Sequence, residues 1–541
     1  MTGAERFVDA LERLDVRVAF GLPGVHNLPL WKALSSSSIR LVGVRHEQTA
    51  VYAADGYARA TGELGVALVT TGPGAANTLG ATGEAMASGS PVLVVATDIP
   101  LALRRPGVYR GVLHETRDQE ALFAPLTKHR RTVASADAIG PAVLQAGRRA
   151  HAAPSGPAYL GIPTDLLRQA AGPVQEPDRE LAAAVPSAAA LRAAARLLST
   201  AERPLIWAGG GALRADAGAE VGELALALNA PVVTTYMARG LIPPDHPCAV
   251  AGPIHAPEVG PLWDDADVVV AIGSDFDGMM TQNWAMPPPE RLIAINVDGD
   301  DASKNYVPDV VLAGDARTVT RRLRERVEPR PGLPALRRRL DAVAASVAAA
   351  VTADDPEAAR FLGALDRVLP DDAIVVADMC IPGYWLGGYR RVRRPRTLAY
   401  PVGWGTLGFG FPASLGSALA GTGPTVCVAG DGGFLFACGE LATAAQERIP
   451  LTVVIVDDGG YGMLRFDQRH AGDEPFGVDL VRPDFERLAA AFGIPAVTVD
   501  GFGGEFEAEL AAAVAARAPA VIVVRAHLKP PPTTSPRWYR R

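Results

Sequence analysis

The chain has 541 residues, of which 48% are hydrophobic and 21% charged, so it is long enough for several domains with large cores. The net charge of −7 argues against a protein that binds nucleic acid through a basic surface. The four cysteines form no CxxC pair, which excludes a zinc ribbon and a disulfide framework and predicts a cytoplasmic protein. No run of 18 apolar residues exists, so we expect no membrane span, and the N-terminus lacks the apolar core of a signal peptide.

Short apolar runs alternate with longer helical stretches from the first residues onward. This alternation is typical of parallel sheets that are covered by helices on both faces. In the first unit, residues 1–175, it predicts helices over 47–60 and 75–87 and strands over 16–20, 39–44, 65–71, 91–97 and 158–162. The polar, proline-bearing stretch 172–186 predicts a linker.

Two further units follow the linker. The second, residues 188–330, has predicted strands at 204–208, 231–235, 267–272, 291–297 and 310–312. The third, residues 345–541, ends in a C-terminal tail and has predicted strands at 373–377, 425–429, 451–456 and 520–525. The sequence therefore predicts an α/β protein with three doubly wound parallel-sheet domains.

Two acidic, glycine-rich turns stand out in the third unit. One predicted strand ends in Gly430–Phe434 (GDGGF), and the next ends in Asp457–Gly462 (DDGGYG). Open parallel sheets bind ligands at the carboxyl ends of their strands, and glycines let backbone amides approach a phosphate closely. Carboxylate and phosphate oxygens are the ligands that Mg²⁺ prefers. Two ordinary turns that carry aspartates are the alternative, which the pairing of both turns disfavours.

The pair of turns resembles the diphosphate-binding signature of thiamine-diphosphate enzymes. The resemblance implies that Asp431, Asp458 and the carbonyl of Gly460 ligate Mg²⁺. It also implies a cofactor-binding role for Gly432, Gly433, Phe434, Gly462 and Met463. The family usually has asparagine where Asp458 stands, so this chain places an additional negative charge beside the diphosphate.

A second match to the same superfamily lies in the first unit. Glu47 follows a predicted strand and opens the helix TAVYAADGYARA, where it could simply stabilise the helix dipole. The HE…A.GYAR run, however, resembles the cofactor-activating stretch of the superfamily, which implies that Glu47 hydrogen-bonds to the aminopyrimidine ring. The turn Gly72–Asn77 resembles another turn of that family.

Two more segments of the third unit resemble cofactor-contacting parts of the family. Within Gly403–Ala413, the resemblance implies that Leu407 holds the cofactor bent and that the carbonyl of Gly405 accepts a hydrogen bond from its amino group. The alternative is a glycine-rich loop before a packed helix. Met379 and Cys380 follow the strand 373–377 and are expected to contact the diphosphate, with Cys380 as a packing residue rather than a nucleophile.

The resemblance extends over essentially the whole chain and is closest to the branch of acetolactate synthase, benzaldehyde lyase and 2-oxo acid decarboxylases. It implies a pyrimidine-binding domain (1–175), a central domain (188–330) and a diphosphate-binding domain (345–541). It also implies thiamine diphosphate and Mg²⁺ as cofactors, and a homodimer or homotetramer whose subunits share active sites.

Two histidines are the candidates for contact with the substrate. His26 stands where benzaldehyde lyase also has a histidine, whereas acetolactate synthases have a small residue; His114 lies in a segment that faces the substrate in both. A histidine titrates near neutral pH and can pass protons to a carbonyl or an alkoxide. Each histidine could instead be structural, and the sequence leaves this open.

FAD is a further candidate cofactor, because some acetolactate synthases contain it. The turn Gly209–Gly211 follows a strand, but Arg214 replaces the last glycine of a dinucleotide fingerprint. Asp275–Thr281 resembles an FAD-contacting stretch in which methionine has replaced arginine. FAD is therefore possible on this pattern but not favoured.

The resemblance predicts a carboligase or decarboxylase that acts on a 2-oxo acid such as pyruvate, with an aldehyde or ketone as a possible acceptor. Three alternatives remain. One is a benzaldehyde-lyase-like acyloin lyase or ligase. Another is a nucleotide-dependent oxidoreductase, which lacks its expected fingerprint. The third is an inactive binding subunit, against which the presence of Glu47 and Asp431 argues.

Overall fold

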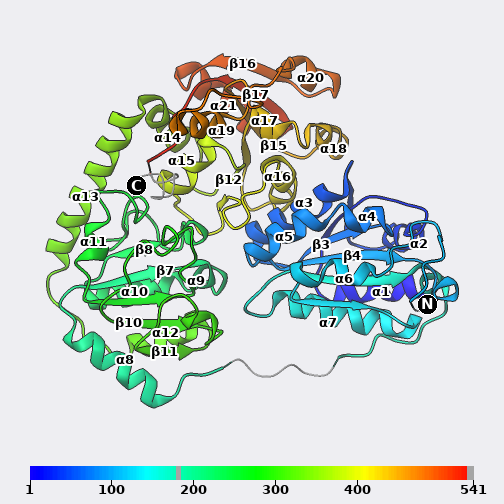
Figure 1. The fold of residues 1–541 in the computed structure, drawn as a ribbon, viewed down its shortest axis with the longest axis horizontal. Coiled ribbons are helices and arrows are strands. Elements are labelled where there is room, and N and C mark those ends of the chain that lie inside the picture. Colours follow the sequence, from blue (N-terminus) through cyan, green and yellow to red (C-terminus); the bar gives the residue numbers. More distant parts are fainter. Residues whose placement is uncertain (106, 178–183, 533–541) are drawn as a thin grey trace.

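The computed structural model describes residues 1–105, 107–177 and 184–532 and shows three α/β domains that follow one another along the chain (Figure 1). Part of the predicted linker 172–186 and the predicted tail from residue 533 onward lie outside these residues. All three sheets consist of parallel strands, which confirms the predicted fold class.

The sheet of the first domain has six strands in the order β2-β1-β3-β4-β6-β5. Helices α1 (Gly3–Arg13) and α7 (Ile139–His151) pack on one face, and α3 (Glu47–Thr61) and α5 (Leu79–Ala87) pack on the other. The strands are β1 (Val18–Gly21), β2 (Arg40–Gly43), β3 (Gly65–Val69), β4 (Val92–Asp98), β5 (His129–Thr132) and β6 (Ala158–Pro163).

The central domain has five strands in the order β11-β10-β9-β7-β8. Helices α8 (Ala188–Thr200), α10 (Gly218–Leu228) and α12 (Ala316–Arg324) cover one face. The other face shares a core with α13 (Leu333–Asp354) and α14 (Pro356–Val368), which lead into the third domain. The strands are β7 (Pro204–Ala208), β8 (Val232–Thr234), β9 (Val268–Ile272), β10 (Leu292–Asn296) and β11 (Val310–Ala313).

The third domain has six strands in the order β13-β12-β14-β15-β17-β16. Helices α14, α15 (Ile381–Tyr389) and α21 (Gly504–Ala516) pack on one face, and α16 (Gly410–Leu419), α18 (Leu441–Glu447) and α20 (Phe485–Ala491) on the other. The strands are β12 (Ile374–Ala377), β13 (Leu398–Ala399), β14 (Thr425–Gly430), β15 (Leu451–Asp457), β16 (Ala496–Asp500) and β17 (Ala520–Arg525).

The first and third domains pack directly against each other where helices α3 and α16 cross (Figure 1). Glycines permit this close approach. A Cβ atom on Gly56 would collide with the carbonyl oxygen of Ala413, and one on Gly416 would collide with the carbonyl oxygen of Ala53. Val376 and Phe409 of the third domain complete the core on this side of the first domain.

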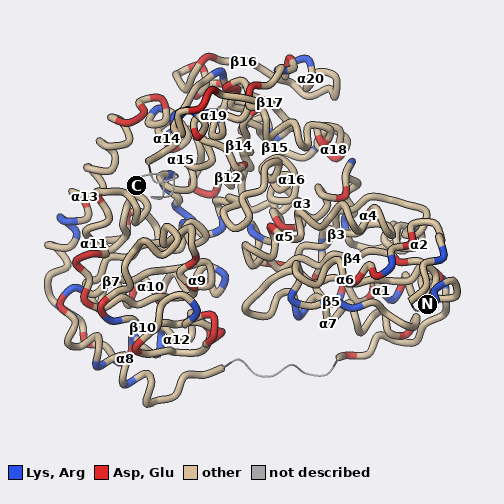
Figure 2. The backbone as a smooth tube through the Cα atoms, in the orientation of Figure 1, with Lys and Arg blue, Asp and Glu red and all other residues tan. Residues whose placement is uncertain are grey.

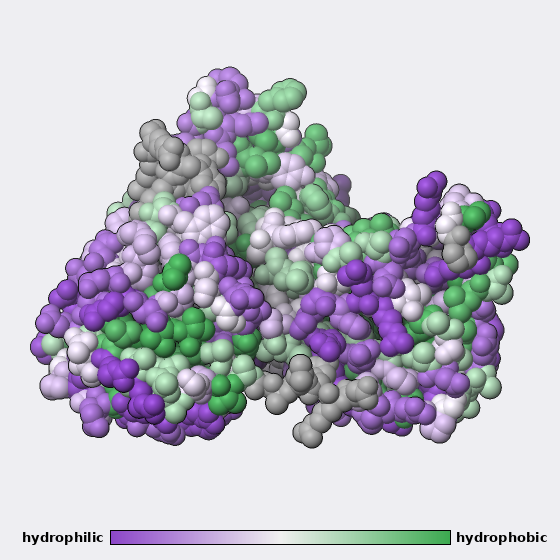
Figure 3. Space-filling model, turned by 60° about the horizontal axis from the view of Figure 1, so that its bottom comes forward, coloured by the Kyte–Doolittle hydropathy of each residue, from purple (hydrophilic) through white to green (hydrophobic). Residues whose placement is uncertain are grey.

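The surface is mixed in character. Lysine and arginine residues are interspersed with aspartate and glutamate residues over all three domains (Figure 2). The space-filling view shows mostly polar side chains, with a group of hydrophobic side chains on the lobe of the central domain (Figure 3). None of the helices in the described ranges combines the length and the apolar character that a membrane span requires.

Candidate active site

One turn of the first domain gathers all three predicted catalytic residues. Glu47 is the first residue of α3 and is only 9% exposed. Asn77, at the end of the turn after β3, donates from Nδ2 to Oε2 of Glu47 over 3.0 Å. Gly74 lies in the same turn, where a Cβ atom would be 3.5 Å from Oε1 of Glu47. The turn therefore fixes one carboxylate oxygen and leaves room beside the other.

Sequence reasoning missed the residue that positions the start of α3. The carboxylate of Glu440 accepts hydrogen bonds from the backbone amides of Arg45, at 2.9 Å, and His46, at 3.1 Å. The hydroxyl of Thr443 donates to the same carboxylate at 2.6 Å. Glu440 is buried between the first and third domains, and these contacts join residues almost 400 positions apart, so no local pattern identifies them.

His26 and His114 come together beside the same turn, with their ring centroids 5.3 Å apart. Nδ1 of His26 lies 2.8 Å from Oγ1 of Thr71, and the Thr71 hydroxyl donates to Thr97. Either atom can donate in the contact between His26 and Thr71, and the tautomer of the ring decides which one does. Burial lowers the pKa of His26, and the neighbouring His114 lowers it further. Nδ1 of His114 is buried and has no hydrogen-bond partner among the described residues.

The two acidic turns of the third domain lie side by side, because β14 and β15 are neighbours and Gly430 pairs with Val456. Oδ1 of Asp431 and Oδ1 of Asp458 are both buried and have no hydrogen-bond partner among the described residues. Burial raises the pKa of Asp431 to about 7, with the charge of Asp458 as the second cause. Burial also raises the pKa of Asp458. Arg465 and His527 oppose the shift of Asp458.

The structure distinguishes Asp458 from the aspartate that precedes it. Nη1 of Arg482 lies 3.2 Å from both carboxylate oxygens of Asp457, so that side chain is already paired. Arg465 pairs with Asp479 at 2.8 Å, and it donates to the backbone carbonyl of Asp458 rather than to its carboxylate. The Asp458 carboxylate therefore remains available to a ligand.

Glycines let these turns pack closely. A Cβ atom on Gly462 would collide with Oδ2 of Asp458, and one on Gly433 would lie 2.9 Å from Oδ2 of Asp378. Gly460 has a φ of +147°, a conformation that L side chains rarely adopt. Among the other residues predicted here, Gly432 lies against Tyr461, Phe434 is buried and Met463 is partly buried.

The donor set fits a divalent cation bound together with phosphate groups. Hard cations such as Mg²⁺ take one or two carboxylates from a protein and complete their coordination with phosphate oxygens and water. The described residues contain no cluster of three or more histidine, cysteine, aspartate or glutamate side chains suited to a metal ion. Asp431 and Asp458 therefore fit a metal that is shared with a bound diphosphate.

The loop before α16 is tied to the end of β12. The carboxylate of Asp378 is fully buried and accepts from the amides of Met379, at 2.7 Å, and Gly408, at 3.1 Å. Burial raises the pKa of Asp378 to about 6. Gly405 has a φ of +70°, and a Cβ atom there would lie 3.3 Å from Cε of Met379. The structure thus places Met379 beside the loop that holds Gly405 and half-buried Leu407.

Cys380 follows Met379 at the end of β12. Its Sγ lies 3.5 Å from the carbonyl oxygen of Asp378, and burial raises the pKa of the thiol. A thiol with a raised pKa forms little thiolate near neutral pH. These contacts support a packing role rather than a nucleophilic one.

Within one chain the predicted residues form two separate groups. The first comprises Glu47, His26 and His114 around the turn after β3, and the second comprises the residues at the ends of β12, β14 and β15. Among the described residues, no hydrogen bond or ion pair joins Glu47 or either histidine to Asp431 or Asp458.

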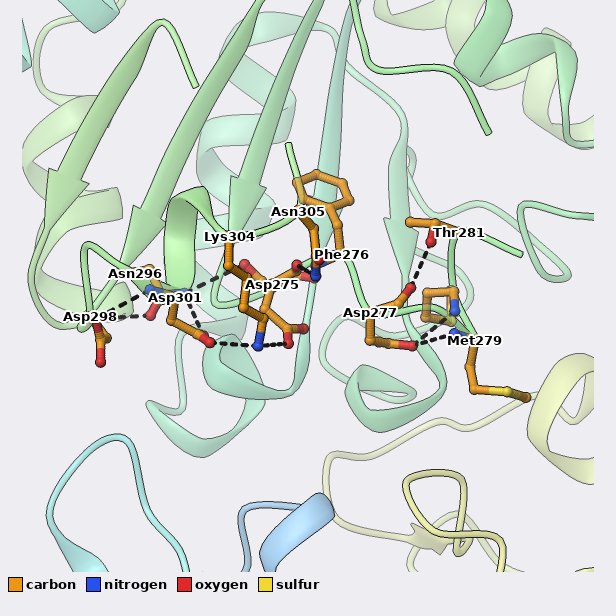
Figure 4. Close-up of polar contacts among 12 residues, drawn as sticks. Asp275, Phe276, Asp277, Met279, Thr281, Asn296, Asp298, Asp301, Lys304 and Asn305 are labelled. Atoms are coloured by element: carbon orange, nitrogen blue, oxygen red, sulfur yellow. Dashed lines mark hydrogen bonds and ion pairs between the residues drawn. The ribbon is translucent and has the colours of Figure 1, made fainter. Parts of the chain in front are cut away.

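The central domain carries its own polar cluster at the ends of β9 and β10 (Figure 4). Nζ of Lys304 lies 2.6 Å from Asp275 and 2.8 Å from Asp301, so one cation is shared by two carboxylates. In the neighbouring turn, the amides of Gly209 and Gly211 donate to the carbonyls of Ile272 and Gly273. A dinucleotide phosphate needs free amides at such a turn. These contacts do not favour FAD.

Comparison with known proteins places this geometry in a family. Residues 1–122 match the model described as thiamine pyrophosphate enzyme, N-terminal TPP binding domain; residues 191–323 match its central domain; and residues 380–524 match its C-terminal TPP binding domain.

Individual relatives cover nearly the whole chain. A probable 2-ketoarginine decarboxylase of Pseudomonas aeruginosa is 37% identical over 91% of this chain and 88% of its own. A probable acetolactate synthase large subunit of Methanocaldococcus jannaschii is 32% identical over 92% of this chain and 87% of its own.

A solved structure supports the fold alone. A thiamine diphosphate-dependent 4-hydroxybenzoylformate decarboxylase of Rhodococcus jostii RHA1 superposes with a TM-score of 0.82 at 24% identity, covering 98% of this chain and 100% of the other. With all three domains matched in order, and with relatives above 30% identity along almost the full length, the chain belongs to the thiamine pyrophosphate enzyme family and is a thiamine-diphosphate-dependent enzyme.

Proposed function

We propose that this enzyme uses thiamine diphosphate and Mg²⁺ to remove CO₂ from a 2-oxo acid, and that the remaining acyl unit is either protonated or joined to a second carbonyl compound. The observation that carries the proposal is the pair of buried, unpartnered carboxylate oxygens on Asp431 and Asp458. The names of two relatives support the reaction class, since one is called a probable 2-ketoarginine decarboxylase and the other a probable acetolactate synthase large subunit.

In this proposal the third domain holds the cofactor. Asp431, Asp458 and the carbonyl of Gly460 ligate Mg²⁺, and the glycine turns admit the diphosphate. The carbonyl of Gly405 would accept a hydrogen bond from the aminopyrimidine and Leu407 would hold the cofactor bent, while Met379 and Cys380 would contact the diphosphate. When bound, the cofactor supplies the nucleophilic carbon and the electron sink that decarboxylation of a 2-oxo acid requires.

In this proposal, side chains of the first domain transfer protons. Glu47 shares a proton with a ring nitrogen of the cofactor, and Asn77 holds one of its oxygens so that the other can face the ring. In the tautomer whose Nδ1 donates to Thr71, His26 would present Nε2 as a proton acceptor. His114 lies against His26, so a proton on one ring disfavours a proton on the other.

We also propose that the active unit is a homodimer or a homotetramer. Each site would combine the Glu47 group of one subunit with the Asp431 group of its partner. Helix α19 (Gly462–Ala471), which starts at the second acidic turn, has no buried residue in the single chain. Several large hydrophobic side chains near these turns are also exposed, namely Trp404, Phe436, Leu464 and Phe466.

An acyloin lyase or ligase similar to benzaldehyde lyase is the second candidate. The observation that favours it is the contact between His26 and His114, since a pair of imidazoles can exchange protons with a hydroxyl and a carbonyl group. Such an enzyme would cleave or form a hydroxyketone without releasing CO₂.

One assay separates these proposals. The enzyme is stripped of metal, reloaded with thiamine diphosphate and Mg²⁺, and given a panel of 2-oxo acids with and without aldehyde acceptors. We expect CO₂ release that depends on both cofactors and is lost in Asp431→Ala but not in Asp500→Asn, an exposed aspartate at the end of neighbouring β16. Joining of the aldehydes to one another as a hydroxyketone, without any release of CO₂ from the panel, would support the second candidate instead.

A further inference from the structure

The loop that is proposed to contact the cofactor, residues 403–408, packs against helix α5 of the first domain. This helix lies on the side of the first domain that faces the third domain (Figure 1). A Cβ atom on Gly83 of α5 would collide with the ring of Trp404. A Cβ atom on Gly403 would lie 2.6 Å from Cβ of Ala87, one helical turn further along α5. The first domain therefore supports this loop at close range.

A buried carboxylate of α5 also forms a hydrogen bond with the loop. The hydroxyl of Thr406 donates to Oε2 of Glu84 at 3.0 Å, and Glu84 is fully buried. Oε1 of the same carboxylate accepts from the hydroxyl of Ser88 at 2.8 Å and from Arg59 at 3.1 Å. Among the described residues, Thr406 is the only donor to Oε2. This buried oxygen therefore depends on the loop for its hydrogen bond.

The same network holds the chain on both sides of the loop. Arg59 forms ion pairs with Asp55 at 2.7 Å and with Glu84 at 3.1 Å. Its Nη1 donates to the carbonyl of Tyr400, before the loop, at 3.0 Å. Its guanidinium carbon lies 4.7 Å from the ring centroid of Phe409, after the loop. Because two buried carboxylates share this one arginine, hydroxyl donors are needed to stabilise the second negative charge.

Thr406 lies directly between the two residues that are proposed to hold the cofactor, Gly405 and Leu407. Gly405 and Gly408 have φ values of +70° and +77°, so the backbone turns on both sides of Thr406 and Leu407. We propose that Glu84 is a positioning residue for the cofactor. Through Thr406 it fixes the loop, and the loop holds the bound cofactor in the geometry in which its C2 proton is removed. This inference rests on the proposed function, in which Gly405 and Leu407 contact the cofactor.

The test removes the hydroxyl of Thr406 and keeps the shape of the side chain. Thr406→Val is isosteric, and Thr406→Ser retains the hydroxyl. Each protein is saturated with thiamine diphosphate and Mg²⁺ and diluted into D₂O, and exchange of the cofactor's C2 proton is followed by NMR after acid quenching. We expect Thr406→Val to slow exchange by at least about tenfold, because small misplacements of reacting groups cost large factors in rate. Thr406→Ser should exchange at close to the wild-type rate.

Thr352→Val is the matched control. Thr352 is exposed on α13, and its hydroxyl bonds only to the carbonyl of Ala348 in the same helix. We expect this variant to exchange at the wild-type rate. Equal slowing in Thr406→Val and Thr406→Ser would show that the hydroxyl does not position the loop, and would overturn the proposal.

Calorimetry of cofactor binding distinguishes positioning from a general loss of the site. The carboxylates proposed to bind the metal, Asp431 and Asp458, are untouched in Thr406→Val, so its affinity for thiamine diphosphate and Mg²⁺ should remain close to that of the wild type. Weaker binding without any change in the exchange rate at saturation would overturn the positioning role.

A double-mutant cycle assigns the effect to the contact itself. Glu84→Gln keeps the size of the side chain and leaves Arg59 paired with Asp55. We expect Glu84→Gln to slow exchange, and we expect little further slowing when Thr406→Val is added, because both changes disrupt one contact. Effects that multiply in the double variant would show that the two residues act independently, which would overturn the proposal.

Exchange of the C2 proton needs the bound cofactor but no substrate, so the two proposals can fail separately. If no 2-oxo acid releases CO₂ while exchange responds as expected, the proposed decarboxylation fails and the role of Glu84 is supported. Wild-type exchange in both Thr406→Val and Glu84→Gln would overturn the role of Glu84 while leaving decarboxylation intact.

Discussion

At the scale of single residues, Glu47 is the most direct test of catalysis. Glu47→Gln preserves the size of the side chain and the hydrogen bond from Asn77, but removes the proton that the proposal requires it to share. We expect cofactor binding to persist and turnover to fall by at least about a hundredfold, the usual scale for the loss of an acid–base group. Steady-state kinetics together with calorimetry of cofactor binding would measure both.

Glu505→Gln provides the matched control, because Glu505 is exposed at the start of α21 and far from the turn after β3. Exchange of the cofactor's C2 proton, followed by NMR, gives a readout separate from turnover. Wild-type exchange in Glu47→Gln would show that Glu47 does not activate the cofactor.

Asp458 tests the metal site. Asp458→Asn keeps an oxygen ligand and removes one negative charge beside the diphosphate, so we expect cofactor binding to be retained or tightened. Asp458→Ala removes the ligand and should weaken binding strongly. Since Arg465 pairs with Asp479 and not with the Asp458 carboxylate, the asparagine variant breaks no ion pair. Calorimetry with thiamine diphosphate and Mg²⁺ would decide, and equal weakening in both variants would rule out a simple ligand role.

His26 predicts a pH dependence. Its pKa lies below the ordinary value of 6.5, because burial and His114 disfavour the protonated ring. If neutral His26 accepts a proton during turnover, kcat/KM should hold as the pH falls to 6.5 and decline only below it. His26→Gln should remove that acidic limb, whereas His151→Gln, at an exposed position, should keep it. An unchanged limb in His26→Gln would assign the titration to another group.

Site residues that belong to short motifs could be predicted from the sequence, whereas residues that act by contacting distant segments were harder to predict. Asp431, Asp458 and Glu47 each follow a recognisable strand. The positioning residues Glu440, Asp378 and Asn77 instead act through contacts with backbone or side chains elsewhere in the chain. Only the folded chain shows that Asp457, and not Asp458, is already paired with Arg482.

At the scale of elements, the crossing of α3 and α16 predicts an unusual response to a glycine substitution. Glycine to alanine in the middle of a helix ordinarily stabilises it by about 1 kcal/mol. Gly416→Ala should instead destabilise the enzyme by about 1–3 kcal/mol, because the added methyl group meets the backbone of Ala53. Urea denaturation measures the free energy of unfolding for both proteins.

Gly363→Ala is the control for this substitution. Gly363 lies inside α14, and a Cβ atom there meets only the flexible guanidinium of Arg367. We expect Gly363→Ala to be neutral or slightly stabilising. If Gly416→Ala behaves in the same way, the two helices can separate without cost and the close crossing is not required.

The strands that sequence reasoning missed, β5, β13 and β16, all lie at the edges of their sheets. All five strands of the central sheet were predicted, and all but edge strand β11 are largely buried. Strand β5 reads HRRT and has no apolar alternation, and in β16 only Val499 is buried. The predicted helix 75–87 is divided into α4 (Pro73–Ala76) and α5, because Asn77 leaves the helix and contacts Glu47.

At the scale of the whole molecule, the two half-sites predict complementation between inactive variants. Glu47→Gln and Asp431→Ala impair opposite halves of the proposed site. If subunits share sites, mixed dimers contain one intact site, and an equal mixture should recover up to about a quarter of wild-type activity. Activity after subunit exchange, with mixed dimers verified by mass spectrometry, measures this. No recovery in verified mixed dimers would show that each chain builds its own site.

The α3–α16 packing also has a consequence for synthesis of the chain. Nearly all of α3 is buried, and part of its cover comes from α16, which begins almost 350 residues after α3 ends. A ribosome adding roughly 5–20 residues per second needs about 20–70 s to make that stretch. During this interval the nascent first domain exposes an apolar helix face that it cannot cover by itself. We therefore expect chaperones to bind the nascent chain during synthesis. The first domain expressed alone should aggregate.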